Sequence, residues 1–315
     1  MQIRSDQREQ LDVRSNAGRE PVLPASRFDD LSGRYRDRGL PNAMTVDVED
    51  YYQVSAFDSV LERKDWEKQP QRLQHTINRV LEMFSAHGVR ATFFTLGWVA
   101  ERYPQLIREI VDAGHELASH GIEHVRVTKL TPAQFAQDVS RSRKLLEDIS
   151  GKPVVGYRAP SFSINDSSFW SYEILAENGY RYSSSIYPIS HDHYGLPSAP
   201  RFPFRCSGGV IEVPLATYPA FGRNWPCAGG GYFRLLPLVY TRYAFARLND
   251  VERMPAVFYF HPWEIDPDQP RMSGIPWKSR FRHYVNLKKF EGRLTRMLKA
   301  FRWSRMDEIY LNVDK

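Results

Sequence analysis

The sequence is poor in cysteine and contains no long apolar run. Its 315 residues include two cysteines, too few for a disulfide framework or a cysteine-based zinc site. No window reaches the roughly 18 consecutive apolar residues of a transmembrane helix, so none is expected. The first residues also lack the apolar stretch of a secretion signal, and the expected location is therefore cytoplasmic.

Basic residues exceed acidic ones only modestly. The chain has 43 Lys and Arg against 37 Asp and Glu, a formal net charge of +6. This excess is expected to be spread over the chain, because no Lys/Arg run resembles the basic arm of a nucleic-acid-binding protein. We interpret it as a solvated basic surface and expect no nucleic-acid partner. A hydrophobic content of 42% with 25% charged residues predicts a globular fold with a sizeable core.

Residues 1–40 are dense in charge and show no sustained hydrophobic period, which predicts a disordered or loosely packed extension. A single folded domain is expected over residues 41–315. From residue 44 onward, β-rich runs and helical patterns alternate at least four times, which predicts an α/β fold with a parallel sheet and right-handed crossovers. The alternation stops at about 187–250, where Pro, Gly and aromatic residues predict long loops over the mouth of the fold.

Four polar residues follow expected strands, namely Asp47, His120, Arg158 and His261. In a barrel of βα units the carboxyl ends of the strands form the catalytic end, so these side chains are expected to share one site. A doubly wound open sheet is the alternative architecture. It is less favoured because no Gly-rich phosphate loop follows the first strand.

Two histidines four residues apart, His120 and His124, follow a short apolar run that predicts the end of a strand. A single turn there would direct both imidazoles toward one point, and neutral imidazole is the commonest protein ligand for zinc-like metals. An isolated pair at this spacing is more often structural than metal-binding. The acidic cluster at 47–50 and the downstream His261 make a hydrolytic metal site the better interpretation.

The order of these motifs resembles that of the polysaccharide deacetylases, the NodB-type carbohydrate esterases. The resemblance covers roughly residues 43–265. Its motifs are Thr45-Val46-Asp47, Ser119-His120 through to His124, Arg158-Ala159-Pro160 and Phe260-His261. It implies a deformed (β/α) barrel, commonly of seven strands.

A further set of stretches is similar to a subgroup found near exosortase-linked exopolysaccharide genes. These stretches are 47–52, 158–163, 261–264 and 282–287. The subgroup has a distinctive C-terminal region, and residues 280–315 of this chain are expected to add a helix and a strand.

The resemblance implies a role for each matched residue. Asp47 corresponds to the general base, and Arg158 to the residue that would hold a catalytic carboxylate by a bidentate contact. His261 corresponds to the general acid, and its apolar surroundings call for a neighbouring carboxylate to keep it charged. His120 and His124 correspond to two ligands of a divalent metal, with Zn²⁺ as the expected ion.

The third metal ligand departs from the family pattern. The family normally has an Asp directly after the base, whereas this chain has Val48 there. Glu49 or Asp50 must then complete the site. Relatives with an acid two positions after the base favour Glu49, but Asp50 stays an alternative. Ser183 is a second departure, at a position where relatives often carry an Asp, and it could lower activity or retune a pKa.

The substrate implied by the resemblance is an N-acetylated glycan, with Pro160, Phe162 and Trp263 expected to contact it. The implied activity is removal of N-acetyl groups from amino sugars of a polysaccharide or its precursor, in exopolysaccharide biosynthesis or modification. One alternative is hydrolysis of another small amide on the same fold. The other is a catalytically impaired protein that binds glycan without turnover, which the departures at Val48 and Ser183 would favour.

Overall fold

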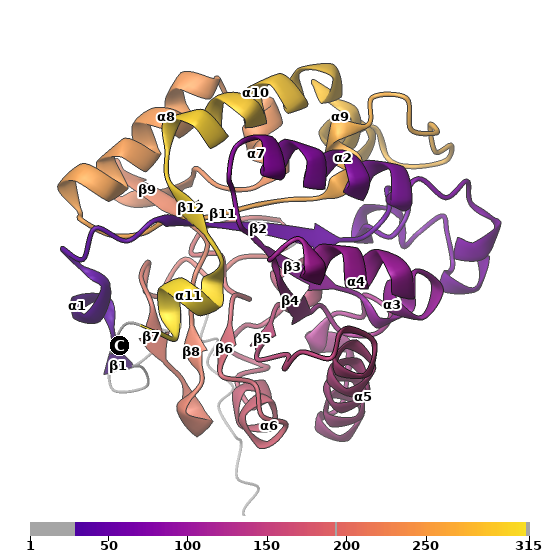
Figure 1. The fold of residues 1–315 in the computed structure, drawn as a ribbon, viewed down its shortest axis with the longest axis horizontal. Helices are drawn as coiled ribbons and strands as arrows, with labels where there is room; N and C mark the ends of the chain where they lie inside the picture. Colours follow the sequence, from indigo (N-terminus) through magenta and orange to yellow (C-terminus); the bar gives the residue numbers. More distant parts are fainter. Residues whose placement is uncertain (1–28, 193, 313–315) are drawn as a thin grey trace, which may run out of the picture.

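The computed structural model describes residues 29–192 and 194–312, and a curled sheet lies at its centre (Figure 1). Within these residues, seven strands run parallel to one another. In spatial order they are β11 (Val257–Phe260), β2 (Asn42–Val48), β3 (Thr92–Thr95), β4 (Glu116–Ser119), β5 (Gly156–Tyr157), β6 (Tyr182–Ser183) and β8 (Ile211–Glu212). The strand direction turns strongly between β2 and β8, so the sheet forms a half barrel. The predicted α/β class and deformed barrel are confirmed.

Three further strands complete this sheet. They are β7 (Phe204–Arg205), which pairs antiparallel with β8, β1 (Asp29–Asp30), which pairs antiparallel with β7, and β12 (Trp303–Ser304), which pairs with the start of β2. The described sheet stays open between β1 and β11.

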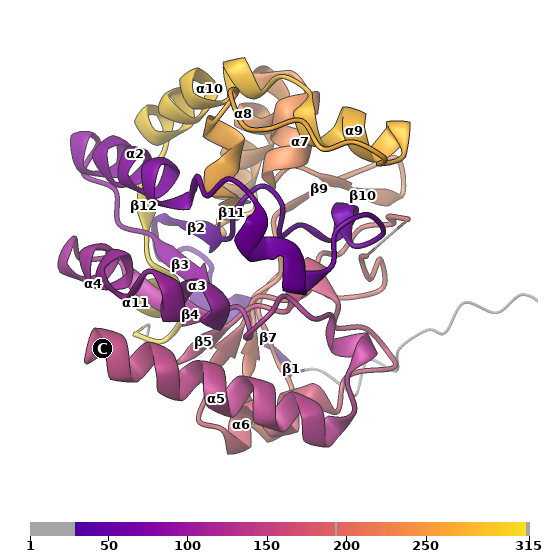
Figure 2. The ribbon, with the colours of Figure 1, turned by 90° about the vertical axis from the view of Figure 1, so that its right-hand side faces the viewer.

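Helices cover the outside of the curled sheet (Figures 1 and 2). They include α2 (Leu73–Ala86), α3 (Gly97–Arg102), α4 (Pro104–Asp112), α5 (Pro132–Ser150), α6 (Ser171–Glu177), α10 (Leu287–Ala300) and α11 (Met306–Tyr310). α5 begins after Thr131, whose hydroxyl oxygen accepts the N–H of Gln134 in a capping box. Among the described helices, none combines the length and apolar character that crossing a bilayer requires.

One face of α2 is apolar and packs on the sheet. Leu73, Ile77, Val80 and Phe84 are all buried, and each such side chain contributes ~1.5–3 kcal/mol when it leaves water.

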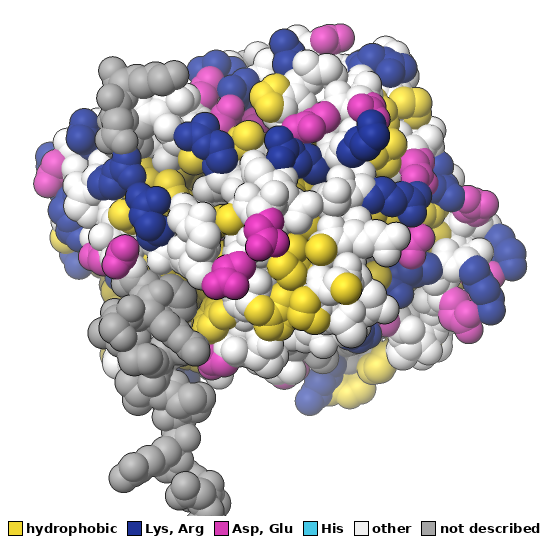
Figure 3. All heavy atoms as spheres, turned by 90° about the horizontal axis from the view of Figure 1, so that it is seen from below, with side chains coloured by type: hydrophobic (Ala, Val, Ile, Leu, Met, Phe, Trp, Pro, Cys, Tyr) yellow, Lys and Arg dark blue, Asp and Glu magenta, His cyan; other side chains and the backbone are white. Residues whose placement is uncertain are grey.

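On the opposite face of the molecule from α10, Lys and Arg side chains are interspersed with Asp and Glu (Figure 3).

Residues 29–40 were predicted to belong to a loose extension, but they pack on the fold. β1 pairs with β7, and the Tyr35 side chain of α1 (Ser32–Tyr35) is 0% exposed and donates a hydrogen bond to the carbonyl of Tyr310. These contacts join segments far apart in sequence, so no local pattern revealed them. Residues 1–28 lie outside the described residues, and the prediction for them stays a prediction.

The region 187–250 was predicted to form long loops, but much of it is regular. It contributes β7 and β8 to the sheet. It also forms a hairpin of β9 (Thr217–Ala220) and β10 (Arg223–Pro226), then α7 (Gly230–Leu235) and α8 (Leu238–Ala246). The glycine run at 229–231, which suggested a loop, instead begins α7. The Glu264 carboxylate occupies the space where a Cβ at Gly230 would lie. Glycine is required there by close packing.

Local sequence explains where two helices begin. The helical stretch that contains α3 and α4 is divided because Pro104 cannot continue α3 and instead begins α4. α6 begins at Ser171. Ahead of it the Asn165 side chain accepts the N–H of Ser167 at 3.0 Å, which stabilises a turn in competition with the helix.

Glu116, at the start of β4, gives the fold a predicted pH dependence. Its carboxylate accepts hydrogen bonds from Tyr182 (2.8 Å), Thr92 (2.5 Å) and the backbone of Asp307 (3.1 Å). Burial, assisted by the charge of Asp307, raises the pKa of Glu116 from 4.5 to about 8. Because this pKa is raised in the folded state, the stabilisation is fully present below about pH 4.5 and is lost as the pH rises through 8.

We therefore expect Glu116→Gln to remove part of the pH dependence of stability. Relative to the variant, the native protein should lose up to ~1.4 kcal/mol of unfolding free energy per pH unit between about pH 5 and 8. Urea unfolding of both proteins at a series of pH values measures this difference. If the unfolding free energies of the two proteins change with pH in the same way, Glu116 does not bind a proton in this pH range.

Candidate metal centre and active site

The predicted site residues meet at the carboxyl edge of the sheet. The arrow of β2 points to the right in Figure 1, so this edge faces the viewer in Figure 2. A cavity of about 560 Å³ opens there. Its lining includes Asp47, Glu49, His120, His124 and His261, which β2, β4 and β11 deliver at their ends. The fold therefore brings these side chains together, as the sequence predicted.

Glu49, His120 and His124 form a group that could hold a metal ion. One potential ligand atom from each residue lies within 4.8 Å of the others, and all three side chains are buried. Glu49 Oε2 lies 3.2 Å from His124 Nε2 and has no hydrogen-bond partner among the described residues. Buried lone pairs facing one another in this way fit a bound cation, and imidazole with carboxylate is a donor set of zinc sites.

The protonation states of the group also suit a metal. Burial lowers the pKa of His120 and lowers the pKa of His124 to about 4, so both imidazoles are neutral at pH 7. Burial would raise the pKa of Glu49, but His124 and His261 outweigh it and bring the pKa to about 2. His120 Nδ1 lies 2.7 Å from the carbonyl oxygen of Arg158. A proton on Nδ1 makes this hydrogen bond and leaves the Nε2 lone pair for a metal.

The turn that presents the two histidines depends on left-handed backbone. Gly121 has φ 77°, and the carboxylate of Asp138 lies where a Cβ of Gly121 would need space. Asp138 also accepts the N–H of Ile122 at 3.2 Å. His124 itself has φ 55°, a conformation that L-residues rarely adopt. The tight turn is therefore held by glycine at 121 and by Asp138.

Asp50 does not join the metal group. Its carboxylate accepts the N–H groups of Tyr51 (2.8 Å), Arg72 (2.8 Å) and Leu73 (3.0 Å) at the beginning of α2. Burial raises the pKa of Asp50 to about 6, and these hydrogen bonds oppose the rise. Of the two candidates for the third ligand, Glu49 is the one that lies beside the histidines.

Arg158 forms a buried ion pair with Asp47. Arg158 Nη1 lies 2.6 Å from Asp47 Oδ1 and also donates to Thr45 Oγ1 at 2.9 Å. Its other nitrogens donate to the carbonyl and hydroxyl oxygens of Ser184, at 3.0 Å each. The contact with Asp47 therefore uses one guanidinium nitrogen, not the two that were predicted, because Ser184 takes the rest of the guanidinium. Asp47 Oδ2 is left facing the cavity.

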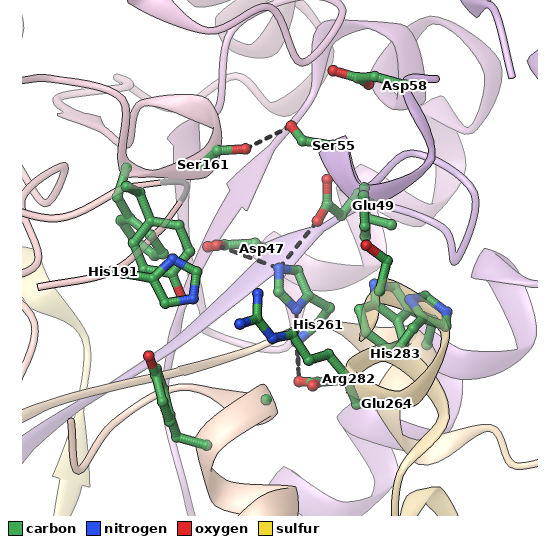
Figure 4. A pocket seen from close by; sticks show the side chains of 18 of the residues that line it. Asp47, Glu49, Ser55, Asp58, Ser161, His191, His261, Glu264, Arg282 and His283 are labelled. Atoms are coloured by element: carbon green, nitrogen blue, oxygen red, sulfur yellow. Dashed lines mark hydrogen bonds and ion pairs between the residues drawn. The ribbon is translucent and has the colours of Figure 1, made fainter. Parts of the chain in front are cut away.

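His261 stands among three carboxylates (Figure 4). Its Nε2 lies 3.0 Å from Glu49 Oε1 and 3.9 Å from Asp47 Oδ2, and its Nδ1 lies 3.6 Å from Glu264 Oε2. Burial would lower the pKa of His261, but Glu49 and Glu264 together raise it to about 10. The neighbouring carboxylate expected from the sequence is thus present twice, and the imidazole is protonated at pH 7.

The three predicted substrate contacts are placed differently. Phe162 and Trp263 line the cavity, whereas Pro160 begins the short turn that carries Phe162. Trp263 is sandwiched between two imidazoles, 5.2 Å from His261 and 4.1 Å from His283 between ring centroids. Only 4% of Trp263 is exposed, so it chiefly positions His261.

Sequence reasoning missed several residues of the site. Glu264 accepts the backbone N–H of His261 at 3.0 Å and forms a buried ion pair with Arg234 at 2.9 Å. Its position three residues after His261 at a strand end was a usable signal, whereas nothing local pointed to Arg234. The hydroxyls of Ser55 and Ser161 lie 2.6 Å apart beside the cavity and join two loops.

Ser183 lies next to a carboxylate from the neighbouring strand. β6 pairs with β8 so that Ser183 is opposite Glu212, which is fully buried. Glu212 accepts the N–H groups of Ser185 and Ile186 at 2.8 Å each. Ser185 in turn accepts the N–H of Ala159 at 2.9 Å, so this network supports the segment that carries Arg158.

The fold and the site define a half-barrel α/β protein with a candidate metal centre, and two family models each match a part of the chain. Residues 57–183 match the family model described as "Polysaccharide deacetylase". Residues 184–311 match a model described as a domain of unknown function, DUF3473. The two matches lie end to end along the chain, and each covers less than half of it. The strands of both regions share one sheet, since β8 pairs with β6 and β11 with β2.

Curated relatives carry deacetylase names. A peptidoglycan deacetylase of Helicobacter pylori is 32% identical over 110 residues, 35% of this chain and 36% of the relative. A peptidoglycan deacetylase-like protein of Gibberella zeae is 26% identical over 207 residues, 61% of this chain and 59% of the relative. The chain thus spans about a third to three fifths of the length of these relatives.

One solved structure supports the fold. The crystal structure of a candidate polysaccharide deacetylase from Mycobacterium smegmatis aligns with a TM-score of 0.57 and 21% identity, covering 88% of this chain and 92% of that one. A CE4 family pseudoenzyme from Bacillus anthracis aligns with a TM-score of 0.43 and 14% identity, covering 87% of this chain and 67% of that one.

Proposed function

We propose that this protein is a metal-dependent hydrolase that removes N-acetyl groups from amino sugars of a polysaccharide or its precursor. The buried group of Glu49, His120 and His124 carries this proposal, because it lies beside Asp47 and His261 on one open cavity. The deacetylase names of the relatives support the same reaction. A role in exopolysaccharide biosynthesis and a cytoplasmic location remain part of the proposal and rest on the sequence.

Each group beside the cavity has a part in amide hydrolysis. A divalent metal held by Glu49, His120 and His124, with Zn²⁺ as the expected ion, would lower the pKa of a bound water to about 7 and polarise the amide carbonyl. Asp47 would accept the proton of the attacking water at Oδ2, because Arg158 occupies Oδ1.

His261 would then act at the leaving group. Its raised pKa keeps the imidazolium charged at neutral pH, so that it can donate a proton to the sugar nitrogen as the C–N bond breaks. The acetyl group leaves as acetate and the sugar as a free amine. Glu264 and Trp263 hold the imidazole in place throughout.

Acetate release from N-acetylglucosamine oligomers tests the proposal. The metal-loaded protein should release acetate, EDTA should abolish the release, and added Zn²⁺ should restore it. Protein shown to hold stoichiometric metal that releases no acetate from these oligomers would favour a different small amide as substrate. Protein that neither holds metal nor releases acetate would favour a glycan-binding role.

A further inference from the structure

One segment beside the cavity carries several positive charges and no negative charge. Residues 269–290 contain six Lys and Arg and no Asp or Glu, so the remainder of the chain has 37 residues of each sign. The six are Arg271, Lys278, Arg280, Arg282, Lys288 and Lys289, and all are exposed.

Within this segment, α9 (Trp277–Tyr284) exposes two aromatic rings. Trp277 is 73% exposed and Phe281 is 52% exposed, and residues four apart lie on the same face of a helix. The other side of α9 is anchored, because His283 is buried and stacks on Trp263 at 4.1 Å. The exposed rings thus project from a fixed helix.

This exposed face is continuous with the wall of the catalytic cavity. Phe281, Arg282 and His283 line the same cavity as Asp47 and His261. In Figure 2, α9 stands beside the carboxyl edge of the sheet, and Figure 4 shows Arg282 and His283 among the residues that line the same pocket as His261. A ligand that enters the cavity over this rim must pass the face of α9.

Two basic residues on α9 are available to such a ligand. Arg282 is already paired with Asp192 at 3.1 Å. Lys278 and Arg280, by contrast, have no acidic partner within salt-bridge distance among the described residues, and Lys278 lies 5.9 Å from the Trp277 ring. Exposed aromatic rings bordered by available cations offer stacking to sugar rings and charge to carboxylates.

We infer that the face of α9 binds an acidic polysaccharide, one in which the N-acetylated sugar is accompanied by uronic acid carboxylates. This inference deepens the proposed function and rests on it for the position of the acetyl group in the cavity. A neutral glycan would gain nothing from the charges of Lys278 and Arg280, which no acidic side chain opposes among the described residues. The opposite face of the molecule, where the two signs are interspersed, shows no such separation (Figure 3).

An anionic membrane surface also attracts basic residues and Trp. The glycan is favoured because the charged and aromatic face does not end at the rim. It turns inward through Phe281 and Arg282 to the catalytic groups, which a flat bilayer surface could not follow. An anionic membrane is therefore the competing ligand, and vesicle binding is measured beside polysaccharide binding.

The test compares Lys278→Gln/Arg280→Gln with a charge-matched control, Lys152→Gln/Lys299→Gln. The control residues are exposed and lie outside the cavity lining. The first probe is a polysaccharide in which N-acetylglucosamine alternates with glucuronic acid, and the second is a neutral N-acetylglucosamine oligomer. At low salt, the α9 variant should bind the acidic polymer roughly tenfold more weakly than the native protein, and the control should bind as the native protein does. Added salt should weaken native binding to the acidic polymer alone.

Acetate release from both polymers, measured in parallel, separates the two proposals. Release without any preference for the acidic polymer would overturn the inference and leave the proposed function intact. No release from either polymer, with acidic-polymer binding that depends on Lys278 and Arg280, would support the binding face and defeat the proposed activity. Binding to vesicles of phosphatidylglycerol that is lost in the α9 variant, without binding to the polysaccharide, would overturn the inference in favour of a membrane.

Discussion

Asp47→Asn is expected to lower acetate release by roughly 10²- to 10⁴-fold, the usual contribution of a positioned general base. The amide retains a carbonyl oxygen that can accept the hydrogen bond from Arg158, but it cannot take a proton from water. Because Asp47 is not one of the three grouped metal-binding side chains, metal content should be preserved. Acetate release and bound metal are measured on the same preparation.

The control for this variant must address stability. Arg158 is fully buried, and removing the opposite charge of a buried pair costs about 3–5 kcal/mol. Thr45→Val provides the comparison, because it removes another oxygen that accepts from Arg158 and leaves the carboxylate of Asp47 in place. It should lower activity by less than about tenfold. If folded, metal-loaded Asp47→Asn keeps more than a tenth of the native rate, Asp47 is not the base.

Much of this site was predictable because parallel strands deliver their ends to one edge. Asp47, His120 and His261 each follow a short apolar run, so the local pattern placed them at strand ends before their distances were known. The turn at Gly121 and His124 was likewise visible as a spacing. Local sequence therefore contained the positions of the reacting groups.

The supporting contacts could not be predicted in this way. Arg234 reaches Glu264 across 30 residues of sequence, and Tyr35 reaches Tyr310 across 275. The glycines at 229–231 suggested a loop, since the packing of Glu264 against Gly230 leaves no local signal. In each case a tertiary contact determined the local structure, whereas sequence pattern reports only on neighbours along the chain.

The choice between Glu49 and Asp50 shows the same limit. Two adjacent carboxylates were equally able to complete the metal site by composition. The start of α2 separates them, because the N–H groups of Arg72 and Leu73 have no partner within the helix and take the carboxylate of Asp50. A helix beginning more than twenty residues later thus decides which acid is left for the metal.

Glu49→Gln is accordingly expected to lower metal affinity by at least ~100-fold, because a neutral amide replaces a charged ligand in a buried site. Asp50→Asn should keep metal affinity within about tenfold of the native value. It should instead lower the free energy of unfolding by ~1–3 kcal/mol, since its charged oxygens accept three backbone N–H groups. Competition for Zn²⁺ with a chelator of known affinity, together with urea unfolding of the metal-free proteins, measures both quantities. Metal lost in Asp50→Asn and kept in Glu49→Gln would exchange the roles of the two residues, because Asp50 would then have to leave the start of α2 to complete the site.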